Sequence, residues 1–302
     1  MKVLLTGAAG QLGQALLASA PHGLVLIACT RSGGAGNLGL DLADAEACRA
    51  VVRSHRPDWL INAGAYTAVD KAESEPELAE AVNAGAPGAF AEALAETGGR
   101  LLQLSTDFVF NGAQGSPYRP EQQVDPMGVY GSSKAAGEAA ALQLAGARVL
   151  RTSWVYGPVG KNFLLTMLRL IGEREQLGVV ADQLGCPTST NSLAAACWRA
   201  IGVGLELDTA TELPRILHYS DAGAASWYDF AVAIAELGQQ LGLLQRAARV
   251  MPISTAEYPT AAKRPSYSLL DCGASRQALG LQPLHWREAL INTMKLIRVK
   301  PC

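Results

Sequence analysis

Short apolar runs alternate with longer amphipathic stretches along the first half of the chain. Four apolar runs are predicted to be buried strands, at residues 2–6, 23–30, 59–62 and 100–105. Helical patterns follow them at about residues 11–20, 43–54, 83–97 and, after a loop over 111–128, at Tyr130 to Ala145. Continuous apolar strands alternating with helices are typical of a parallel sheet covered on both faces. The pattern predicts a Rossmann-type, doubly wound α/β fold.

The alternation loosens after Trp154. Further helices are expected at residues 162–172, 192–203 and 227–241, and strands at 177–181 and 216–219, with a polar linker at 204–214. We expect a first domain over residues 1–155, completed by roughly 215–245. The remainder of 156–302 is expected to be mainly a smaller C-terminal α/β domain. Trp227, Tyr228 and Trp286 are interpreted as packing residues, because aromatic side chains near helix starts usually lie in the core.

Composition removes several classes of function. The 302 residues carry 25 basic and 27 acidic side chains without a long basic run, which argues against nucleic acid or an anionic membrane as a partner. No apolar run is long enough to span a bilayer, and the apolar start breaks at Gly7. The six cysteines form no Cys-x-x-Cys pair and the four histidines have no ligand spacing, so we expect a cytoplasmic protein without a metal.

A glycine motif follows the first predicted strand. Gly7, Gly10 and Gly13 stand at three-residue spacing, with Gln11 and Leu12 between the last two. Glycines at a strand-to-helix turn let the backbone approach a pyrophosphate, which then faces the positive end of the helix. The alternative is an ordinary glycine-rich turn. Its place at the first such turn of a series favours a dinucleotide site.

The end of the second strand indicates which dinucleotide binds. An acidic residue there usually holds the ribose 2′-hydroxyl of NAD, but this chain has Thr30 and Arg31 instead. A guanidinium suits a 2′-phosphate, so NADPH is predicted over NADH, with a solvated loop arginine as the alternative. Asp41 and Leu42 are expected to edge the adenine, although Asp41 could equally cap the helix at 43–54.

The third strand ends in small residues that leave room for a cofactor. Ala63, Gly64 and Ala65 follow it, before Tyr66 and the polar stretch 67–84. The charged residues of that stretch are expected to be solvated or structural. They are Asp70, Lys71, Glu73 and Glu75.

Three residues carry candidate chemistry. Tyr130 and Lys134 are four positions apart on a predicted helix, so their side chains share one face. The ammonium is expected to lower the tyrosine pKa and make a proton donor that works near neutral pH. Thr106, at the end of the fourth strand, could hydrogen-bond a substrate carbonyl. The alternatives are a chance pair on a solvated helix and a capping threonine.

Together with the glycine motif, Thr106, Tyr130 and Lys134 resemble the extended short-chain dehydrogenase/reductases. Six further motifs narrow the resemblance to the dTDP-4-dehydrorhamnose reductase family, which the chain resembles almost to its end at Arg264-Pro265. They are Gly10 to Gly13, Thr67 to Glu73, Ser105 to Phe110, Arg151 to Tyr156, Asp182-Gln183 and Pro187-Thr188.

The resemblance implies a role for each matching residue. Tyr130 would be the proton donor, Lys134 its tuner and a ligand of the nicotinamide ribose, and Thr106 a partner of the C4 oxygen. Thr67, Val69, Asp107 and Trp154 would contact the sugar, and Arg264 is a candidate for the diphosphate, with a surface arginine as the alternative. The implied cofactor contacts are Gly10 to Leu12, Thr30, Asp41, Leu42 and Ala65 to Thr67.

The implied reaction is the NADPH-dependent reduction of dTDP-4-dehydro-L-rhamnose to dTDP-L-rhamnose, a polysaccharide precursor. The chain departs from the family at the second strand, which lacks its frequent acidic end and puts use of NADH in doubt, and at Phe108 and Ser266 to Ser268. Some members dimerise through a magnesium ion, but Ala15 and Asn191 occupy the matching positions, so any homodimer should lack that bridge.

Two rival functions remain open. A sugar-nucleotide dehydratase or epimerase is one, although dehydratases carry an Asp-Glu pair where this chain has Asp107-Phe108. A non-catalytic regulatory subunit that binds NADP and a partner protein is the other.

Overall fold

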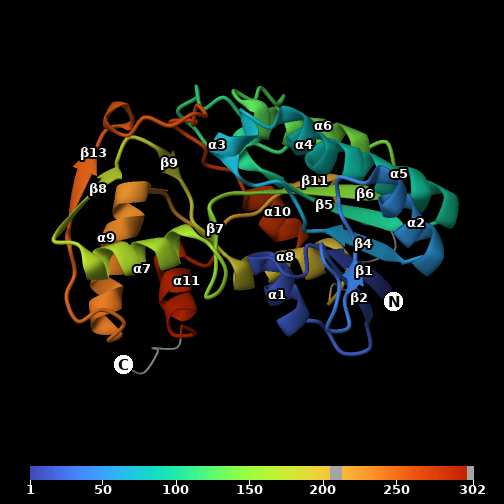
Figure 1. Ribbon diagram of the computed structural model, residues 1–302, viewed down its shortest axis with the longest axis horizontal. Helices are drawn as coiled ribbons and strands as arrows, with labels where there is room; N and C mark the ends of the chain where they lie inside the picture. Colours follow the sequence, from blue (N-terminus) through green and yellow to red (C-terminus); the bar gives the residue numbers. More distant parts are fainter. Residues whose placement is uncertain (205–212, 298–302) are drawn as a thin grey trace.

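One seven-stranded sheet organises the computed structural model, which describes residues 1–204 and 213–297 (Figure 1). Its strand order is β11-β6-β5-β4-β1-β2-β3, and every neighbouring pair is parallel. The strands are β1 (Lys2–Thr6), β2 (Val25–Thr30), β3 (Leu38–Gly39), β4 (Trp59–Asn62), β5 (Arg100–Thr106), β6 (Ala147–Thr152) and β11 (Ile216–His218). The chain moves outward in both directions from β1, which makes the carboxyl edge beside β1 the expected ligand site.

Helices cover both faces of this sheet because its strands are apolar on both sides. Along β1, Val3 and Leu5 face one core with α1 (Gln11–Ala18) and α8 (Thr190–Ala200), while Leu4 faces the other. That second core contains side chains from α2 (Ala45–His55), α5 (Ala86–Thr97) and α6 (Val129–Ala141). The predicted Rossmann-type fold is therefore confirmed, and the sheet holds the first turn of α6 near the end of β5.

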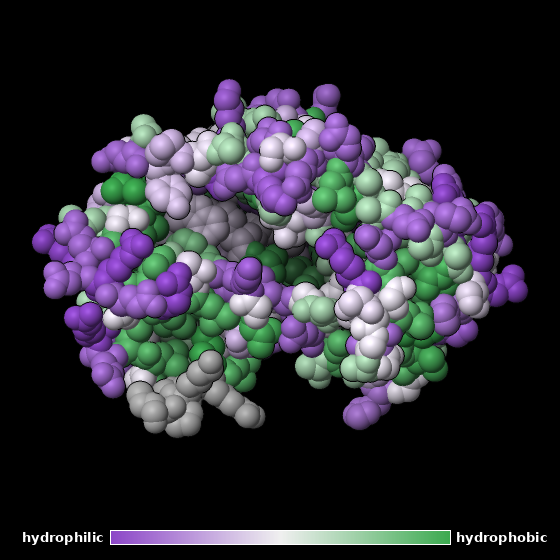
Figure 2. All heavy atoms as spheres, viewed as in Figure 1, coloured by the Kyte–Doolittle hydropathy of each residue, from purple (hydrophilic) through white to green (hydrophobic). Residues whose placement is uncertain are grey.

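A second, smaller lobe has its own core. It is built from α7 (Phe163–Glu173), β8 (Gln176–Val180), α9 (Trp227–Gln240), β13 (Arg249–Ile253) and α11 (Trp286–Met294). Three short strand pairs belong to this part of the fold: β13 with β8, β10 (Thr188–Ser189) with β7 (Val155–Tyr156), and β12 (Ala225–Ser226) with β9 (Leu184–Gly185). The molecular surface is hollowed between the two lobes (Figure 2).

The polar stretch after β4 contains more structure than its sequence suggested. It forms α3 (Val69–Ala72), α4 (Pro76–Glu80) and a π-helical turn (Ala81–Gly85) that leads into α5. The Asn83 amide, buried in that turn, exchanges hydrogen bonds with the backbone of Tyr66 and donates to the Ser133 hydroxyl of α6. The loop after β4 is thereby fixed against the helix that carries Tyr130.

Several elements differ from the sequence-based predictions. The helix from Tyr130 ends at Ala141 rather than Ala145, and the short edge strand β3 lies between β2 and α2, where no strand was predicted. The late strand β11 joins the sheet as expected, but α9 packs in the second core and α8 against the first. We therefore propose a first lobe of residues 1–152 with α8 and β11, in place of completion by 215–245.

The remaining short helices connect these parts. They are η2 (Asp107–Val109), η3 (Thr255–Glu257) and α10 (Gly273–Ala278). Most of the predicted linker, residues 205–212, lies outside the described residues. Over residues 1–204 and 213–297, no helix has the length and apolar character needed to cross a membrane.

Candidate active site

The three motif glycines have different structural roles at the turn from β1 to α1. Gly7 adopts a left-handed φ of +65°, and a Cβ there would lie 2.6 Å from the Gly64 backbone nitrogen. A Cβ on Gly13 would collide with the Gly7 carbonyl oxygen, so Gly13 permits close packing of helix on strand. Gly10 is exposed at the N-terminus of α1, where a Cβ would meet only the Gly7 oxygen at 3.1 Å. Gly10 is thus the bare position that a phosphate could approach.

A pocket of roughly 200 Å³ opens beside this turn, and it unites three of the predicted cofactor segments. Its lining includes Gly7 and Gly10 from the first, Thr30, Arg31 and Leu42 from the second and Gly64 and Ala65 from the third. A helix N-terminus and a guanidinium in one pocket fit a nucleotide that carries several phosphates. Cys29 also lines the pocket, although sequence reasoning passed over it.

The other predicted cofactor residues lie around this pocket without lining it. Asp41 accepts the Ala43 N–H at 3.0 Å, and the N-cap of α2 is Asp44, so the alternative that Asp41 caps this helix is wrong. Ala63 precedes the lining residues, and Thr67 is exposed beyond them. Tyr66 turns its hydroxyl away to Glu75, to which it donates at 2.7 Å.

The predicted catalytic residues meet where β5 ends. Thr106 is the last residue of β5, and its hydroxyl donates to Asp107 Oδ1 at 3.0 Å. The Tyr130 ring, on the first turn of α6, packs edge-on against Phe108 with centroids 5.6 Å apart. The Thr106 hydroxyl lies close enough to the Tyr130 phenol to oppose the rise in the pKa of Tyr130. A carbonyl oxygen placed between these two hydroxyls would accept from the Tyr130 phenol, and from Thr106 once its single hydroxyl proton turns from Asp107 to the carbonyl.

The expected lowering of the tyrosine pKa is wrong for this arrangement. Burial raises the pKa of Tyr130 to about 12, and the nearby Asp107 charge acts in the same direction. The Lys134 ammonium donates to the Leu104 carbonyl at 2.6 Å. Burial lowers the pKa of Lys134 to about 8, against the opposing influence of Glu138. The phenol is therefore held in its protonated, acidic form.

A buried ionic network lies beneath these residues, and we call Ser105, Lys134, Glu138, Arg151 and His218 the floor of the site. Strand register places Ser105 beside Arg151. Glu138 accepts from Ser105 at 2.5 Å and from two Arg151 nitrogens at 2.8 and 2.6 Å. These side-chain bonds connect α6 to β5 and β6.

His218 extends the floor to the loop before α6. Its Nε2 lies 3.3 Å from an Arg151 nitrogen and its Nδ1 lies 3.0 Å from the Tyr118 carbonyl oxygen. Burial and the Arg151 charge lower the pKa of His218 to about 3, so the ring is neutral at physiological pH. The same arginine donates to the Pro120 carbonyl, which anchors the loop at 111–128.

Asp107 is buried beside Thr106, and no cation among the described residues pairs with its carboxyl group. Burial raises its pKa to about 6, although the Ser268 and Thr106 hydroxyls oppose the shift. Its Oδ2 lacks a hydrogen-bond partner of good geometry within the described residues. A buried carboxylate with a free acceptor is suited to the hydroxyl groups of a sugar.

The Trp154 ring stacks on the Trp227 ring. Their centroids are 3.5 Å apart with an interplanar angle of 5°, and Trp154 has a left-handed φ of +47°. Trp227 also lines a pocket of roughly 560 Å³ in the second lobe, together with Arg264, Gln183 and Tyr258. An aromatic and cationic pocket of this size fits a nucleotide portion of a substrate.

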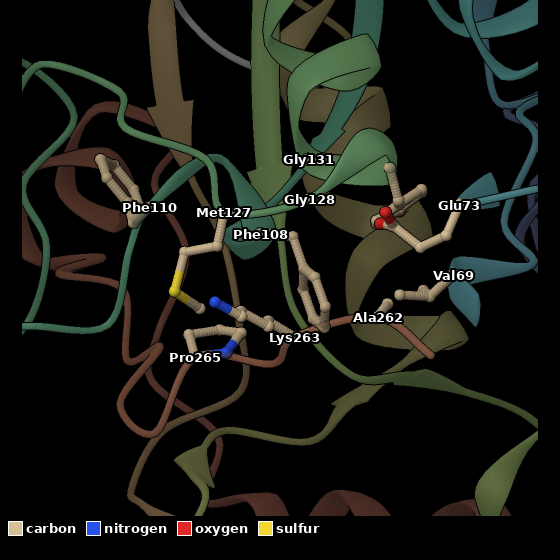
Figure 3. A pocket seen from close by; sticks show the side chains of 11 residues that line it. Val69, Glu73, Phe108, Phe110, Met127, Gly128, Gly131, Ala262, Lys263 and Pro265 are labelled. Carbon is tan, nitrogen blue, oxygen red and sulfur yellow. The ribbon is translucent and has the colours of Figure 1, made fainter. Parts of the chain in front are cut away.

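We call Asp70, Glu73, Ala262 and Arg264 the rim of the site. Arg264 forms a two-pronged ion pair with Asp70, at 2.7 and 3.1 Å, and Asp70 also accepts the Ala262 N–H at 3.1 Å. Glu73 accepts the Val129 N–H at 2.9 Å. A small cavity between these groups and Tyr130 is lined by Val69, Phe108 and Pro265 among others (Figure 3).

The family model for the RmlD substrate binding domain matches residues 1–299. The chain belongs to this family. It is similar to dTDP-4-dehydrorhamnose reductases of Sinorhizobium fredii, 40% identical over 96% of this chain and 95% of the relative, and of Escherichia coli, 38% identical over 95% of each.

Solved structures agree with this membership. The dTDP-4-dehydrorhamnose reductase of Clostridium acetobutylicum is 34% identical over 98% of this chain and 99% of its own, with a TM-score of 0.87. That of Bacillus anthracis, solved in complex with NADP, is 33% identical over 97% and 98%, with a TM-score of 0.86. A Thermus thermophilus UDP-glucose 4-epimerase, 21% identical with a TM-score of 0.77, shares the fold.

Within this RmlD family member, three groups near the site make contacts that the sequence alone did not reveal. Glu138 stands four residues after Lys134 on the same helix face, which is a signal that could have been read. Trp227 was interpreted as packing alone, and its stacking on Trp154 depends on a contact between distant segments. Glu73 was expected to be solvated or structural, and its bond to Val129 spans 56 residues.

Proposed function

We propose that this protein is a dTDP-4-dehydrorhamnose reductase that converts dTDP-4-dehydro-L-rhamnose to dTDP-L-rhamnose. The observation that carries the proposal is the convergence of Thr106, Tyr130 and Lys134 at the end of β5, next to a nucleotide pocket. It occurs in a chain that is about two-fifths identical to reductases of that name over nearly its whole length.

NADPH supplies the hydride, and the residues of the first lobe hold it. The N-terminus of α1 at Gly10 faces the pyrophosphate, and Arg31 provides a cation for the 2′-phosphate. Leu42 and Ala65 offer apolar contacts within the same pocket. Lys134, whose ammonium also donates to the Leu104 carbonyl, holds the nicotinamide ribose.

Tyr130 delivers the proton that completes the reduction. The C4 carbon gains the hydride while the C4 oxygen takes the phenolic proton, so the carbonyl becomes a hydroxyl. Because the pKa of Tyr130 lies near 12, the phenol is fully protonated before the reaction. Thr106 donates to the same oxygen, and the Lys134 ammonium stabilises the tyrosinate that forms.

Substrate selectivity rests on the other wall and on the second lobe. Asp107 offers its free oxygen to sugar hydroxyls, and Trp154 presents a ring fixed by Trp227. Thr67 and Val69 flank the sugar, and Arg264, which lines the larger pocket, binds the diphosphate. The protein works in the cytoplasm, and any homodimer forms without a metal bridge.

The rival dehydratase function lacks its second carboxylate here. The residue after Asp107 is Phe108, whose ring packs against Tyr130 instead of presenting an acid. A non-catalytic regulatory subunit would bind NADP without consuming it.

The test is NADPH oxidation with dTDP-4-dehydrorhamnose made in situ by its upstream enzymes, with the product identified by mass and NMR. We expect oxidation that requires the sugar and yields dTDP-L-rhamnose. Tight NADPH binding without oxidation would favour the regulatory function, and a different product would assign another keto-sugar.

The cofactor choice is tested in the same assay with Arg31→Ala. Losing the 2′-phosphate contact should raise KM for NADPH about tenfold and leave KM for NADH unchanged. Arg119→Ala, a surface arginine paired only with Glu121 among the described residues, is the matched control. An unchanged NADPH preference in Arg31→Ala would overturn the role of Arg31.

A further inference from the structure

The helix that carries Tyr130 does not cap its own N-terminus. Its N-cap residue is Gly128, which has no side chain to accept the first free N–H groups. The Val129 N–H instead donates to Glu73 Oε1 at 2.9 Å, from a residue 56 positions earlier. The Glu73 carboxylate points toward this first turn of α6 (Figure 3). An anion at a helix N-terminus also interacts favourably with the helix dipole.

The Glu73 carboxylate limits the space for a side chain at Gly128. Its φ of −144° and ψ of 174° are extended values that any residue adopts, so the backbone itself does not require glycine. A Cβ at this position would lie 2.7 Å from Glu73 Oε1. Any larger residue would therefore push the carboxylate away, which links the two positions independently of the hydrogen bond.

Glu73 itself is held near the site by its neighbours. It directly follows α3. Asp70 of that helix binds Arg264 and accepts the Ala262 N–H, both from a segment near the end of the chain. Tyr130 is the residue immediately after Val129, so movement of that amide moves the phenol. Thr106 and Tyr130 must present their hydroxyls to one oxygen, and misplacement of about 1 Å can cost on the order of 100-fold in rate.

We propose that Glu73 is a positioning residue that fixes the Tyr130 phenol against Thr106 by capping α6 from outside the helix. This inference rests on the proposed reductase function. It assigns a task in the chemical step to a carboxylate that does not touch the substrate. The required property is a hydrogen-bond acceptor at Oε1, and the negative charge is secondary.

The test measures single-turnover hydride transfer, together with KM for both substrates, in four variants. Glu73→Ala should slow the chemical step about tenfold, since the first turn of α6 loses its cap and the phenol shifts with it. Gly128→Ala should reproduce this loss without altering Glu73. Glu73→Gln keeps an acceptor oxygen and should stay within about twofold of wild type. Glu77→Ala, an exposed carboxylate of α4, should match wild type.

The pattern separates positioning from general destabilisation. Both slow variants should keep KM for NADPH and the sugar near wild type and show a larger solvent isotope effect, because proton transfer becomes harder. Glu73→Ala as fast as Glu77→Ala, or Glu73→Gln as slow as Glu73→Ala, would overturn the inference. An inactive wild type would instead refute the reductase function itself.

Discussion

The floor and the rim hold the same catalytic helix by different means. In the floor, the Arg151 and Glu138 side chains are only 3% and 5% exposed and meet through two short hydrogen bonds. In the rim, the Arg264 and Asp70 side chains are 23% and 46% exposed. Breaking a buried ion pair strands a charge without solvent, whereas an exposed pair is largely replaced by water. We therefore expect the floor to determine the folding stability and the charge of the site. We expect the rim to adjust the geometry of the site.

Removing a floor carboxylate gives the largest expected effect on stability. Glu138→Ala leaves the Arg151 guanidinium buried without its partner and should cost about 3–5 kcal/mol in the free energy of unfolding. Urea unfolding followed by circular dichroism measures the loss. The same experiment on the exposed pair Arg169–Glu173, with Glu173→Ala, should show less than about 1 kcal/mol. Equal losses would erase the distinction between buried and exposed pairs.

Asp107 extends the comparison because it is buried like the floor but pairs with no cation in the part of the chain that the structure describes. Its pKa of about 6 exceeds the ordinary value of 3.8, so the folded state binds this proton more tightly than the unfolded state. The resulting stabilisation is complete below about pH 4 and disappears as the pH rises to about 6. Asp107→Asn should thus raise the free energy of unfolding at pH 7 by roughly 1–3 kcal/mol while impairing reduction.

Chemical denaturation from pH 4 to 8 checks this prediction. Across pH 4 to 6 the wild-type protein should lose stability relative to Asp107→Asn. Asp182→Asn is the control of opposite sign, because hydrogen bonds from Thr255 lower the pKa of that exposed carboxyl. A less stable Asp107→Asn at pH 7 would show that the buried charge is compensated after all.

The rim should yield the smallest stability effect and a visible kinetic one. Asp70→Ala removes the partner of Arg264 and of the Ala262 N–H, at a cost below about 1 kcal/mol in unfolding free energy. The segment that contains Ala262 and Arg264 loses these bonds. We therefore expect KM for the sugar nucleotide to rise about threefold while KM for NADPH stays constant. Steady-state kinetics and urea unfolding of this variant measure the two effects. A stability loss as large as that of Glu138→Ala would contradict the expectation that the ion pair of Asp70 contributes little to stability.

The cofactor side was predictable because its parts follow local rules. Each segment is a strand followed by a turn, and parallel strands bring those turns to one edge, so Gly10, Thr30 and Gly64 could be grouped without knowing the fold in detail. The helix that carries Tyr130 and Lys134 was found in the same way. Its end was misplaced by four residues because apolar and alanine-rich sequence continues past Ala141.

The floor and rim could not be derived by such rules. Arg264 pairs with a residue 194 positions away, and Arg151 and His218 come together only through the register of β6 and β11. The tyrosine pKa was misjudged for a related reason. Helical spacing places Lys134 one turn from Tyr130, but it reveals neither the burial of the phenol nor the Leu104 carbonyl that binds the ammonium.

The most direct test of the account is single-turnover hydride transfer from bound NADPH in Tyr130→Phe, with the NADPH dissociation constant measured on the same samples. The variant retains the ring that packs against Phe108 and removes only the phenolic hydroxyl, which carries the acidic proton. We predict a 10²–10⁴-fold slower transfer with unchanged NADPH affinity. Transfer within tenfold of wild type would contradict the central claim that Tyr130 is the proton donor.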